Sequence, residues 1–482
     1  MASNQQITLV RGLGLIAAIS IILGNVIGTG VFLKTRVMTC NVGSPTWVLA
    51  AWIFAGLLSL AGALTYAELA AMMPRAGGEY VFLKNAYGRV WSFLYGWMQI
   101  LIAKTGSQAS VAVAFAIFLN DLLGGKIKQV LFTANIFGYP YEITNLQLIA
   151  LGLIAAITVL NCATVAVSGG VATVLTVVKI GLVLVVGIGA FVLADGNFGN
   201  FAQTAVGGAC EGVASTANFG AVDYTFAAGF GAAMLGALWG YDGWNNLTLV
   251  AGEVKNPQKN IPLALVGGTA LIILLYVFVN AAYFYVLTPT DIANVSKESS
   301  VAREVAARFM GAGVISLMAA GLMASSIGTL HTSILTGARV PYAMARDGLF
   351  FQNLAKLSSK TRVPVKALIV QGVWAGILTL SGSFDTLTDY VVFGSWIFYA
   401  LTTASIFIFR RNLPDAERPY KAFGYPVVPV LFLLVAGWLL LNTLYTTPRQ
   451  AITGIVLILL GLPVYYYLSR QNNVVPEYSD ED

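Results

Sequence analysis

The chain contains 482 residues, of which 57% are hydrophobic and only 10% are charged, with a mean hydropathy of +0.78. Soluble proteins carry about 25% charged residues, so this composition argues against an ordinary cytosolic enzyme. The 50 glycines follow no Gly-X-Y repeat, which excludes collagen, and the long apolar runs exclude disorder. A membrane-spanning helix needs about 20 mainly apolar residues, so this length accommodates about a dozen spans. The composition therefore predicts a polytopic helical membrane protein.

The remaining bulk features exclude further classes of protein. The formal charge is +6, but the basic residues are not clustered on a soluble face, so we expect no nucleic acid partner. The chain has one His, and Cys40, Cys162 and Cys210 lack the spacing of metal ligands. We therefore expect no metal site and no cofactor. The apolar stretch after Arg11 lacks a cleavage site followed by a soluble domain, and we interpret it as a retained first helix.

Twelve apolar windows along the chain predict twelve membrane-spanning helices. No linker or change in composition separates two soluble domains, so we expect residues 1–482 to form one transmembrane domain. The longest polar connection, 195–229, is rich in Gly and Ala and contains no Lys or Arg. The windows are 13–34, 46–72, 90–119, 145–162, 171–194, 230–251, 262–288, 309–338, 365–381, 388–409, 425–445 and 451–469.

The distribution of basic residues sets the orientation of these spans in the lipid bilayer. With the N-terminus inside, most Lys and Arg residues fall in connections on the cytoplasmic side, among them Arg75, Lys84, Arg339 and Arg410. An even number of spans then places the C-terminus on the same side. We predict a multi-pass protein of the plasma (inner) membrane with both termini in the cytoplasm.

Two of the predicted helices contain clusters of glycine. The first contains Gly24-Asn25-Val26-Ile27-Gly28-Thr29-Gly30, and the sixth contains Gly240-Tyr241-Asp242-Gly243-Trp244-Asn245. Glycine destabilises a helix interior by about 1 kcal/mol relative to alanine, so such clusters favour unwinding. Unwound backbone at membrane depth is tolerated only where it lines a cavity or is buried in protein.

Two unwound helices would provide the groups that an α-amino acid needs. Freed amides at the start of a second half-helix can bind a carboxylate, and freed carbonyls can bind an ammonium group. The alternative is that these glycines only let helices pack closely. Because the clusters lie five helices apart, a repeated five-helix unit would be inverted in the membrane, with both of its first helices broken. This spacing favours a transporter.

A lysine, Lys179, lies inside the fifth predicted helix. An ammonium group near the bilayer centre costs about 2.5–3.5 kcal/mol on insertion scales, so it needs carbonyls or a carboxylate nearby. Snorkelling to the surface is the alternative, but the helix continues apolar for several turns on one side. We predict that Lys179 is a fixed cation that supports the unwound part of the first helix and substitutes for a bound sodium ion.

Other polar or aromatic side chains in the spans have two interpretations each. Asp242 either caps the second half-helix or tunes the site toward polar or cationic side chains. Trp239 either covers the substrate as a lid or packs between helices. Three further ionisable groups are interpreted as satisfied packing contacts rather than a proton relay, and these are Glu68, Lys104 and His331.

The order and spacing of several motifs carry a family resemblance along nearly the whole chain. The chain resembles the amino acid–polyamine–organocation superfamily, and specifically a bacterial-type member of its L-type amino acid transporter family. The motifs are Gly28-Thr29-Gly30, Tyr66-Ala67-Glu68-Leu69, Pro74-Arg75-Ala76-Gly77-Gly78-Glu79-Tyr80, Trp239 to Asn245, Gly252-Glu253-Val254-Lys255-Asn256-Pro257, and Gly337 to Gly348.

The resemblance implies an all-helical fold with twelve spans, built as an inverted repeat of five plus five helices. The first repeat would cover about 13–194, the second about 230–409, and two extra helices about 425–469. It also implies sodium-independent exchange of amino acids by alternating access.

The resemblance further implies a substrate site at the two breaks. Amides near Thr29 and Gly30 would hold the substrate carboxylate, while the carbonyls of Val26, Trp239 and Asp242 would face the α-amino group. Trp239 is similar to the aromatic gate of the family, and Lys179 matches its lysine of the fifth helix. The expected substrate-binding residues are Val26, Gly28, Thr29, Gly30, Ser107, Trp239, Gly240 and Asp242.

The sequence departs from the family pattern in two places. Animal members carry a cysteine between the third and fourth helices that tethers a heavy subunit, whereas residues 121–144 contain none, so we expect no disulfide-linked heavy subunit. Asp242 stands where several members that transport neutral substrates have glycine, which leaves the substrate range open. In the resembling fold, the loops that hold Cys40 and Cys210 adjoin outside the membrane, where a disulfide is chemically permitted.

The preferred hypothesis is a secondary antiporter of L-amino acids, with neutral ones favoured. The alternative within transport is an exchanger of cationic amino acids or polyamines. An alternative from a different class is a sensor that binds amino acids without transporting them. The sequence contains no nucleophile–base pair or metal cluster, so we do not expect an enzyme.

Overall fold

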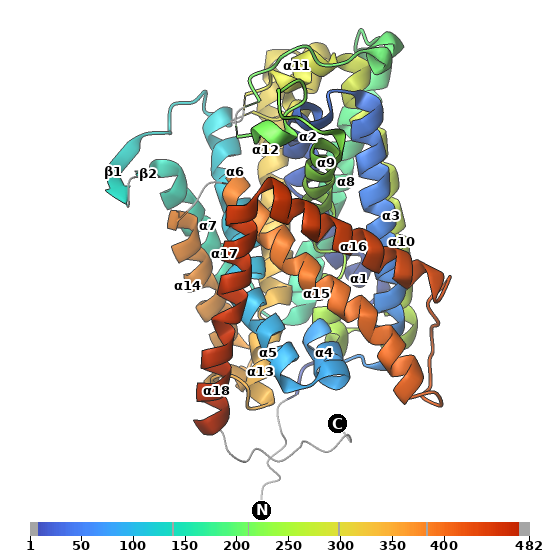
Figure 1. Cartoon of the computed structure of the whole chain (residues 1–482). Helices are drawn as coiled ribbons and strands as arrows, with labels where there is room; N and C mark the ends of the chain where they lie inside the picture. Colours follow the sequence, from blue (N-terminus) through green and yellow to red (C-terminus); the bar gives the residue numbers. More distant parts are fainter. Residues whose placement is uncertain (1–7, 137–138, 211, 297–298, 382–383, 472–482) are drawn as a thin grey trace, which may run out of the picture.

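The computed structural model of the chain describes residues 8–136, 139–210, 212–296, 299–381 and 384–471. Long apolar helices run side by side in one bundle (Figure 1). In this described part, nine helices are long and apolar enough to cross a membrane, and two shorter apolar helices, Asn145–Leu160 and Val365–Leu380, accompany them. The prediction of a polytopic helical membrane protein is confirmed.

The elements of the first half are α1 (Leu15–Val26), α2 (Gly30–Val42), α3 (Pro45–Met72), α4 (Glu79–Tyr87), α5 (Arg89–Met98), a π turn (Gln99–Ala103), α6 (Lys104–Leu122), β1 (Val130–Ile136), β2 (Tyr139–Thr144), α7 (Asn145–Leu160) and α8 (Val165–Leu193). The connection to the second half holds two short 3₁₀ turns, Phe198–Ala202 and Ser215–Ala217.

The elements of the second half are α9 (Phe226–Tyr241), a 3₁₀ segment (Asn246–Glu253), α10 (Pro257–Val286), α11 (Pro289–Ala293), α12 (Val301–Gly337), α13 (Arg339–Arg346), a 3₁₀ turn (Gln352–Ala355), α14 (Val365–Ser381), α15 (Phe384–Asn412), α16 (Val427–Thr446), α17 (Pro448–Leu459) and α18 (Gly461–Gln471).

The first predicted window, 13–34, is too short. The structure continues this span through α2 to Val42. Lys34, the last residue of this window, and Arg36, just beyond it, lie within α2 and are each only 5% exposed. A hydropathy window ends at such charges, because it averages consecutive residues and contains no information on tertiary packing.

A β-hairpin departs from the all-helical expectation. Strands β1 and β2 pair antiparallel between α6 and α7, with an irregularity between Val130 and Phe132. Strand β2 ends at Thr144, which forms a capping box at the start of α7. The Thr144 side chain accepts a hydrogen bond from the Gln147 amide, and the Gln147 side chain accepts one from the Thr144 amide. The hairpin projects from the side of the bundle (Figure 1), so it does not shape the interior.

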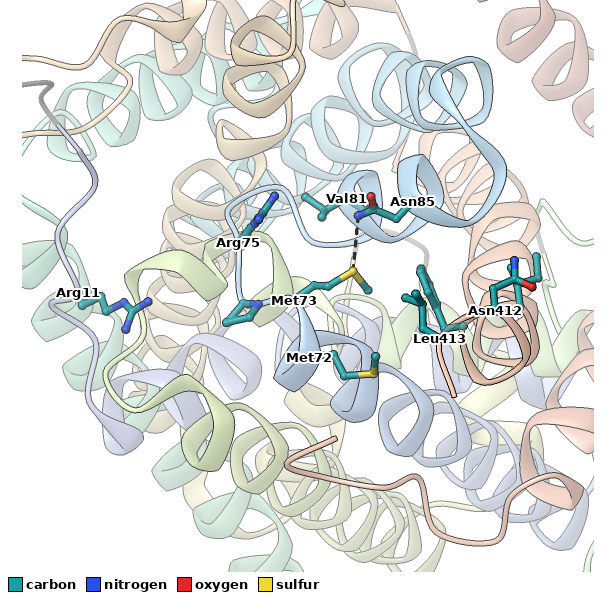
Figure 2. A pocket seen from close by; sticks show the side chains of 11 residues that line it. Arg11, Met72, Met73, Arg75, Val81, Asn85, Asn412 and Leu413 are labelled. Atoms are coloured by element: carbon teal, nitrogen blue, oxygen red, sulfur yellow. Dashed lines mark hydrogen bonds between the residues drawn. The ribbon is translucent and has the colours of Figure 1, made fainter. Parts of the chain in front are cut away.

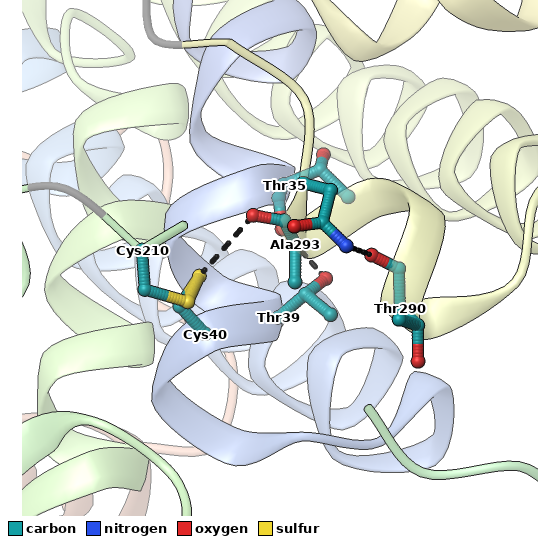
Figure 3. The surroundings of a disulfide bond; sticks show 7 residues. Thr35, Thr39, Cys40, Cys210, Thr290 and Ala293 are labelled. Atoms are coloured by element: carbon teal, nitrogen blue, oxygen red, sulfur yellow. Dashed lines mark hydrogen bonds between the residues drawn. A yellow bond between two sulfur atoms is a disulfide. The ribbon is translucent and has the colours of Figure 1, made fainter. Parts of the chain in front are cut away.

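The end of α2 is held by a disulfide between Cys40 and Cys210, a pairing that the sequence permitted but left open (Figure 3). Cys40 lies within α2 rather than in the loop after it. The backbone adds two hydrogen bonds, from the Ala205 amide to the Gly43 carbonyl at 2.7 Å and from the Phe219 amide to the Cys40 carbonyl at 2.8 Å. The long connection after α8 is therefore fixed to the end of α2.

We expect Cys162 to be the only cysteine that reacts with a maleimide when the folded protein is labelled without reductant. The other two sulfur atoms are bonded to each other, and Cys162 is partly exposed. The measurement is the mass of the labelled protein, with Cys162→Ser as the control that should take up no label. Labelling of Cys40 and Cys210 before reduction would contradict the disulfide.

Candidate functional site

The first glycine cluster is a break between two helices, as predicted. Helix α1 ends at Val26 and α2 begins at Gly30, with Ile27 in a non-helical conformation (φ −72°, ψ 84°). The freed Ile27 carbonyl accepts from the hydroxyls of Ser325 at 3.3 Å and Thr329 at 3.4 Å, both on α12. Helix α12 thus supplies part of the hydrogen bonding that the break removed.

The second glycine cluster is also a break. Helix α9 ends at Tyr241, and the chain turns at Asp242 (φ −57°, ψ 139°) before the 3₁₀ segment begins at Asn246. Gly243 has φ +100°, which L side chains rarely adopt, and a Cβ there would lie 2.9 Å from the Asn25 Cβ. Glycine is therefore required where the sixth predicted helix passes the first.

The two breaks contact each other directly. A Cβ on Gly30 would lie 2.6 Å from the Cα of Gly240, so only glycine allows this approach. The Tyr276 hydroxyl, from α10, lies 2.6 Å from the Val26 carbonyl and 2.9 Å from the Gly240 carbonyl. Sequence reasoning missed Tyr276; the available signal was a tyrosine inside an apolar span, whose hydroxyl needs a partner.

Lys179 lies on α8 and is fully buried. Its ammonium group donates to the Gly24 carbonyl at 2.6 Å and to the Thr329 hydroxyl at 2.7 Å. Thr176, one turn earlier, donates to the Ser20 carbonyl at 3.0 Å. Helix α8 therefore contacts the last turns of α1 immediately before the break, with a cation held by neutral oxygens.

Other expected site residues lie around this contact. Trp239, on the last turn of α9, is 7% exposed, and its ring carbon Cδ1 would lie 3.2 Å from a Cβ on Gly30. Thr29 is buried at the start of α2, and its hydroxyl has no hydrogen-bond partner among the described residues. Ser107 is partly exposed on α6, three residues after Lys104. The structure thus brings Thr29, Gly30 and Trp239 together, with Ser107 on a neighbouring helix.

The second break continues into a polar network with α6 and α15. The Tyr399 hydroxyl, on α15, donates to the Asp242 carboxylate at 2.8 Å and lies 3.3 Å from the Asn245 side-chain oxygen. Lys104 directly follows the π turn and donates to the side-chain oxygen of Asn246. The ammonium group of Lys104 also lies within electrostatic range of Asp242.

Glu79 completes this network, although the sequence analysis used it only as a family marker. It begins α4, in the connection between two spans, and is fully buried. Its carboxylate accepts from Tyr95 at 2.6 Å, from Asn245 at 2.7 Å and from Tyr66 at 3.1 Å. Burial raises the pKa of the Glu79 carboxyl, while these hydrogen bonds and the charge of Lys104 act in the opposite direction.

Two further ionisable groups are satisfied packing contacts. Glu68 accepts two hydrogen bonds from Arg410, at 3.0 and 2.6 Å, and one from the Ala422 amide at 2.6 Å. The His331 ring lies 3.0 Å from both the Asn161 side-chain nitrogen and the Ser168 carbonyl. The carbonyl can only accept, so His331 Nε2 donates to it and Nδ1 accepts from Asn161.

A bundle of apolar spanning helices, with two helices broken where they meet inside it, defines a polytopic membrane protein of the transporter class. The chain belongs to the amino acid permease family, whose model matches residues 13–467.

Curated relatives match the chain over almost its whole length. The b(0,+)-type amino acid transporter 1 of Mus musculus is 30% identical over 96% of this chain and 88% of its own. The serine/threonine exchanger SteT of Bacillus subtilis (strain 168) is 30% identical over 96% of this chain and 97% of its own. The large neutral amino acids transporter small subunit 2 of Mus musculus is 29% identical, over 95% and 81% respectively.

Proposed function

We propose that the protein is a sodium-independent antiporter that exchanges L-amino acids, with neutral ones preferred, across the plasma membrane by alternating access. The observation that carries the proposal is the pair of breaks, whose backbone polar groups face each other inside an apolar bundle. Membership of the amino acid permease family and relatives named as amino acid transporters or exchangers support it.

The proposed arrangement in the membrane follows from the same features. The two breaks would open the two five-helix repeats, about 13–194 and 230–409, and both termini would lie in the cytoplasm. We propose no disulfide-linked heavy subunit, because residues 121–144 carry no cysteine.

In the proposed site, the substrate carboxylate binds at the start of α2. The Thr29 hydroxyl is buried next to the free amides of that helix end, and a carboxylate is the ligand that such groups favour. The α-amino group would bind carbonyls of the two breaks, including those of Val26 and Gly240. Because Gly30 and Gly240 are in contact, substrate entry would require the two breaks to separate.

Lys179 would take the place of a coupling sodium ion. Its ammonium group supplies one fixed positive charge to a carbonyl of α1 and a hydroxyl of α12, which are ligands of the kind that sodium uses. A protein that carries this charge covalently has no need to bind it from solution.

We expect amino acid exchange to continue unchanged when choline replaces sodium, and Lys179→Ala to remove most of the exchange. The measurement is uptake of labelled alanine into proteoliposomes loaded with unlabelled alanine. Lys128→Ala, which removes an exposed lysine in the connection between α6 and β1, is the control and should remain active. Uptake by the unmodified protein that stops in choline would rule out this role for Lys179.

We expect Trp239→Ala to raise the Michaelis constant or slow exchange, because the ring would no longer close over the substrate from outside. Trp47→Ala is the matched control, since Trp47 is 44% exposed on α3 and its loss should leave exchange intact. Both variants should elute as folded protein in size-exclusion chromatography. If exchange kinetics are the same with and without the Trp239 ring, the ring only packs between helices.

Asp242 supports an exchanger of cationic amino acids as the second candidate, because a carboxylate in the break could attract a cationic side chain. We favour neutral substrates, since Tyr399 donates to this carboxylate and the charge of Lys104 acts on it. The Asp242 carboxylate therefore already has a hydrogen-bond donor and a nearby positive charge within the protein.

We therefore expect leucine to compete with labelled alanine uptake more strongly than arginine, and Asp242→Asn to have a mild effect. If instead Asp242 binds a second substrate cation, arginine should compete strongly, and Asp242→Gly should weaken it by roughly five- to a hundredfold. The measurement is competition by arginine and leucine in the unmodified protein and both variants. Strong arginine inhibition that is lost in Asp242→Gly would overturn the preference for neutral substrates.

A further inference from the structure

A cavity of about 540 Å³ lies away from the two breaks (Figure 2). It is next to α4, which lies at the end of the bundle where α18 ends (Figure 1). The ends of α3 and α15 and one face of α4 line it, together with the segment before α1 and the connection after α3. The lining residues are Arg11, Met72, Met73, Pro74, Arg75, Val81, Asn85, Ile408, Phe409, Asn412 and Leu413. The proposed amino acid site uses none of them.

One side of the cavity is basic. Arg11 precedes α1, and Arg75 lies in the connection between α3 and α4; Figure 2 shows both on one side of the cavity. None of the described lining residues is acidic. The nearest carboxylate along α3, that of Glu68, is already bound by Arg410. The cavity therefore favours a negatively charged ligand.

The rest of the lining is largely apolar and continues a lipid-facing surface. On α3, the side chains of Phe54 and Leu57 are 55% and 51% exposed, as expected for residues that contact lipid. Met72 follows Phe54 by 18 residues, about five helical turns, and so lies on the same face. Leu413, across the cavity in Figure 2, is 48% exposed. A ligand with a charged head and an apolar chain matches this combination.

We propose that this cavity binds the phosphate headgroup of an anionic phospholipid from the cytoplasmic leaflet. Arg11 and Arg75 contact the phosphate oxygens, and the apolar side chains at Met72 and Leu413 contact the start of the acyl chain. The basic-residue distribution places this end of the bundle at the cytoplasmic surface, where anionic lipids are enriched. The site does not depend on amino acid exchange.

Two other sources of negative charge could occupy the same cavity. Free phosphate would use the same arginines without the apolar wall. The segment of sequence after α18 contains Glu477, Asp480, Glu481 and Asp482, and an extended chain of this length spans roughly 35 Å. Each of these occupants predicts a different result in the following experiment.

The experiment measures binding of phosphatidylglycerol and phosphatidylcholine to the purified, delipidated full-length protein by native mass spectrometry. The test variants are Arg11→Gln and the double variant Arg11→Gln/Arg75→Gln. The control is Lys356→Gln/Lys360→Gln, which removes two exposed basic residues outside the cavity. Thermal unfolding without lipid checks that each variant is folded, and the single Arg11 variant provides the test if the double variant does not fold.

We expect selective binding of phosphatidylglycerol that weakens roughly fivefold in the single variant and roughly 25-fold in the double variant. The control should bind like the unmodified protein, and excess inorganic phosphate should not compete. Deletion of residues 472–482 should leave binding and its dependence on the arginines unchanged.

Three results would overturn the proposal. Equal loss of binding in the lysine control would indicate unspecific attraction to a basic surface. Full competition by inorganic phosphate would indicate a site for a free anion. If binding strengthens on deletion of 472–482 and still depends on Arg11, the acidic segment is the occupant in the full-length protein.

Discussion

The requirement that backbone polar groups be satisfied in the absence of water governs this structure. Two helices unwind inside an apolar bundle, and the groups they free are met by side chains from neighbouring helices. The Tyr276 hydroxyl lies within hydrogen-bond distance of one carbonyl from each break. The Lys179 ammonium group donates to the Gly24 carbonyl, and the Ser325 hydroxyl of α12 donates to that of Ile27. Lys179 of α8, Tyr276 of α10 and Ser325 of α12 therefore owe their buried positions to the breaks.

The segments that flank the two broken helices are also in contact. The segment after the second break ends at Glu253, whose carboxylate forms a fully buried pair with Arg339 at 2.8 Å. The backbone of Glu253 accepts from the Leu13 amide at 2.9 Å, and Lys255 donates back to the Leu13 carbonyl at 2.8 Å. Removing one member of such a buried pair costs about 3–5 kcal/mol, because the remaining charge is left buried without its partner.

The sequence was sufficient for the features that depend on local composition. Apolar length predicted the spans, and glycine clusters predicted both breaks, because each signal lies in consecutive residues. The partners of the breaks could not be predicted in this way. Tyr276 is one tyrosine among 21, and Glu79 lies more than 160 residues from Asn245, which it binds. Burial of Lys34 and Arg36 within α2 likewise depends on distant segments.

The two halves of the first span are anchored by different chemistry. The end of α2 is joined to the 194–225 connection by a covalent disulfide, whereas the start of α1 is joined to the end of the 3₁₀ segment by backbone hydrogen bonds. Hydrogen bonds can break and re-form without covalent chemistry, whereas a disulfide persists unless it is reduced. The first span is therefore held covalently near its end at Cys40 and by reversible hydrogen bonds just before its start at Leu15. The break between Val26 and Gly30 lies between these two differently anchored ends.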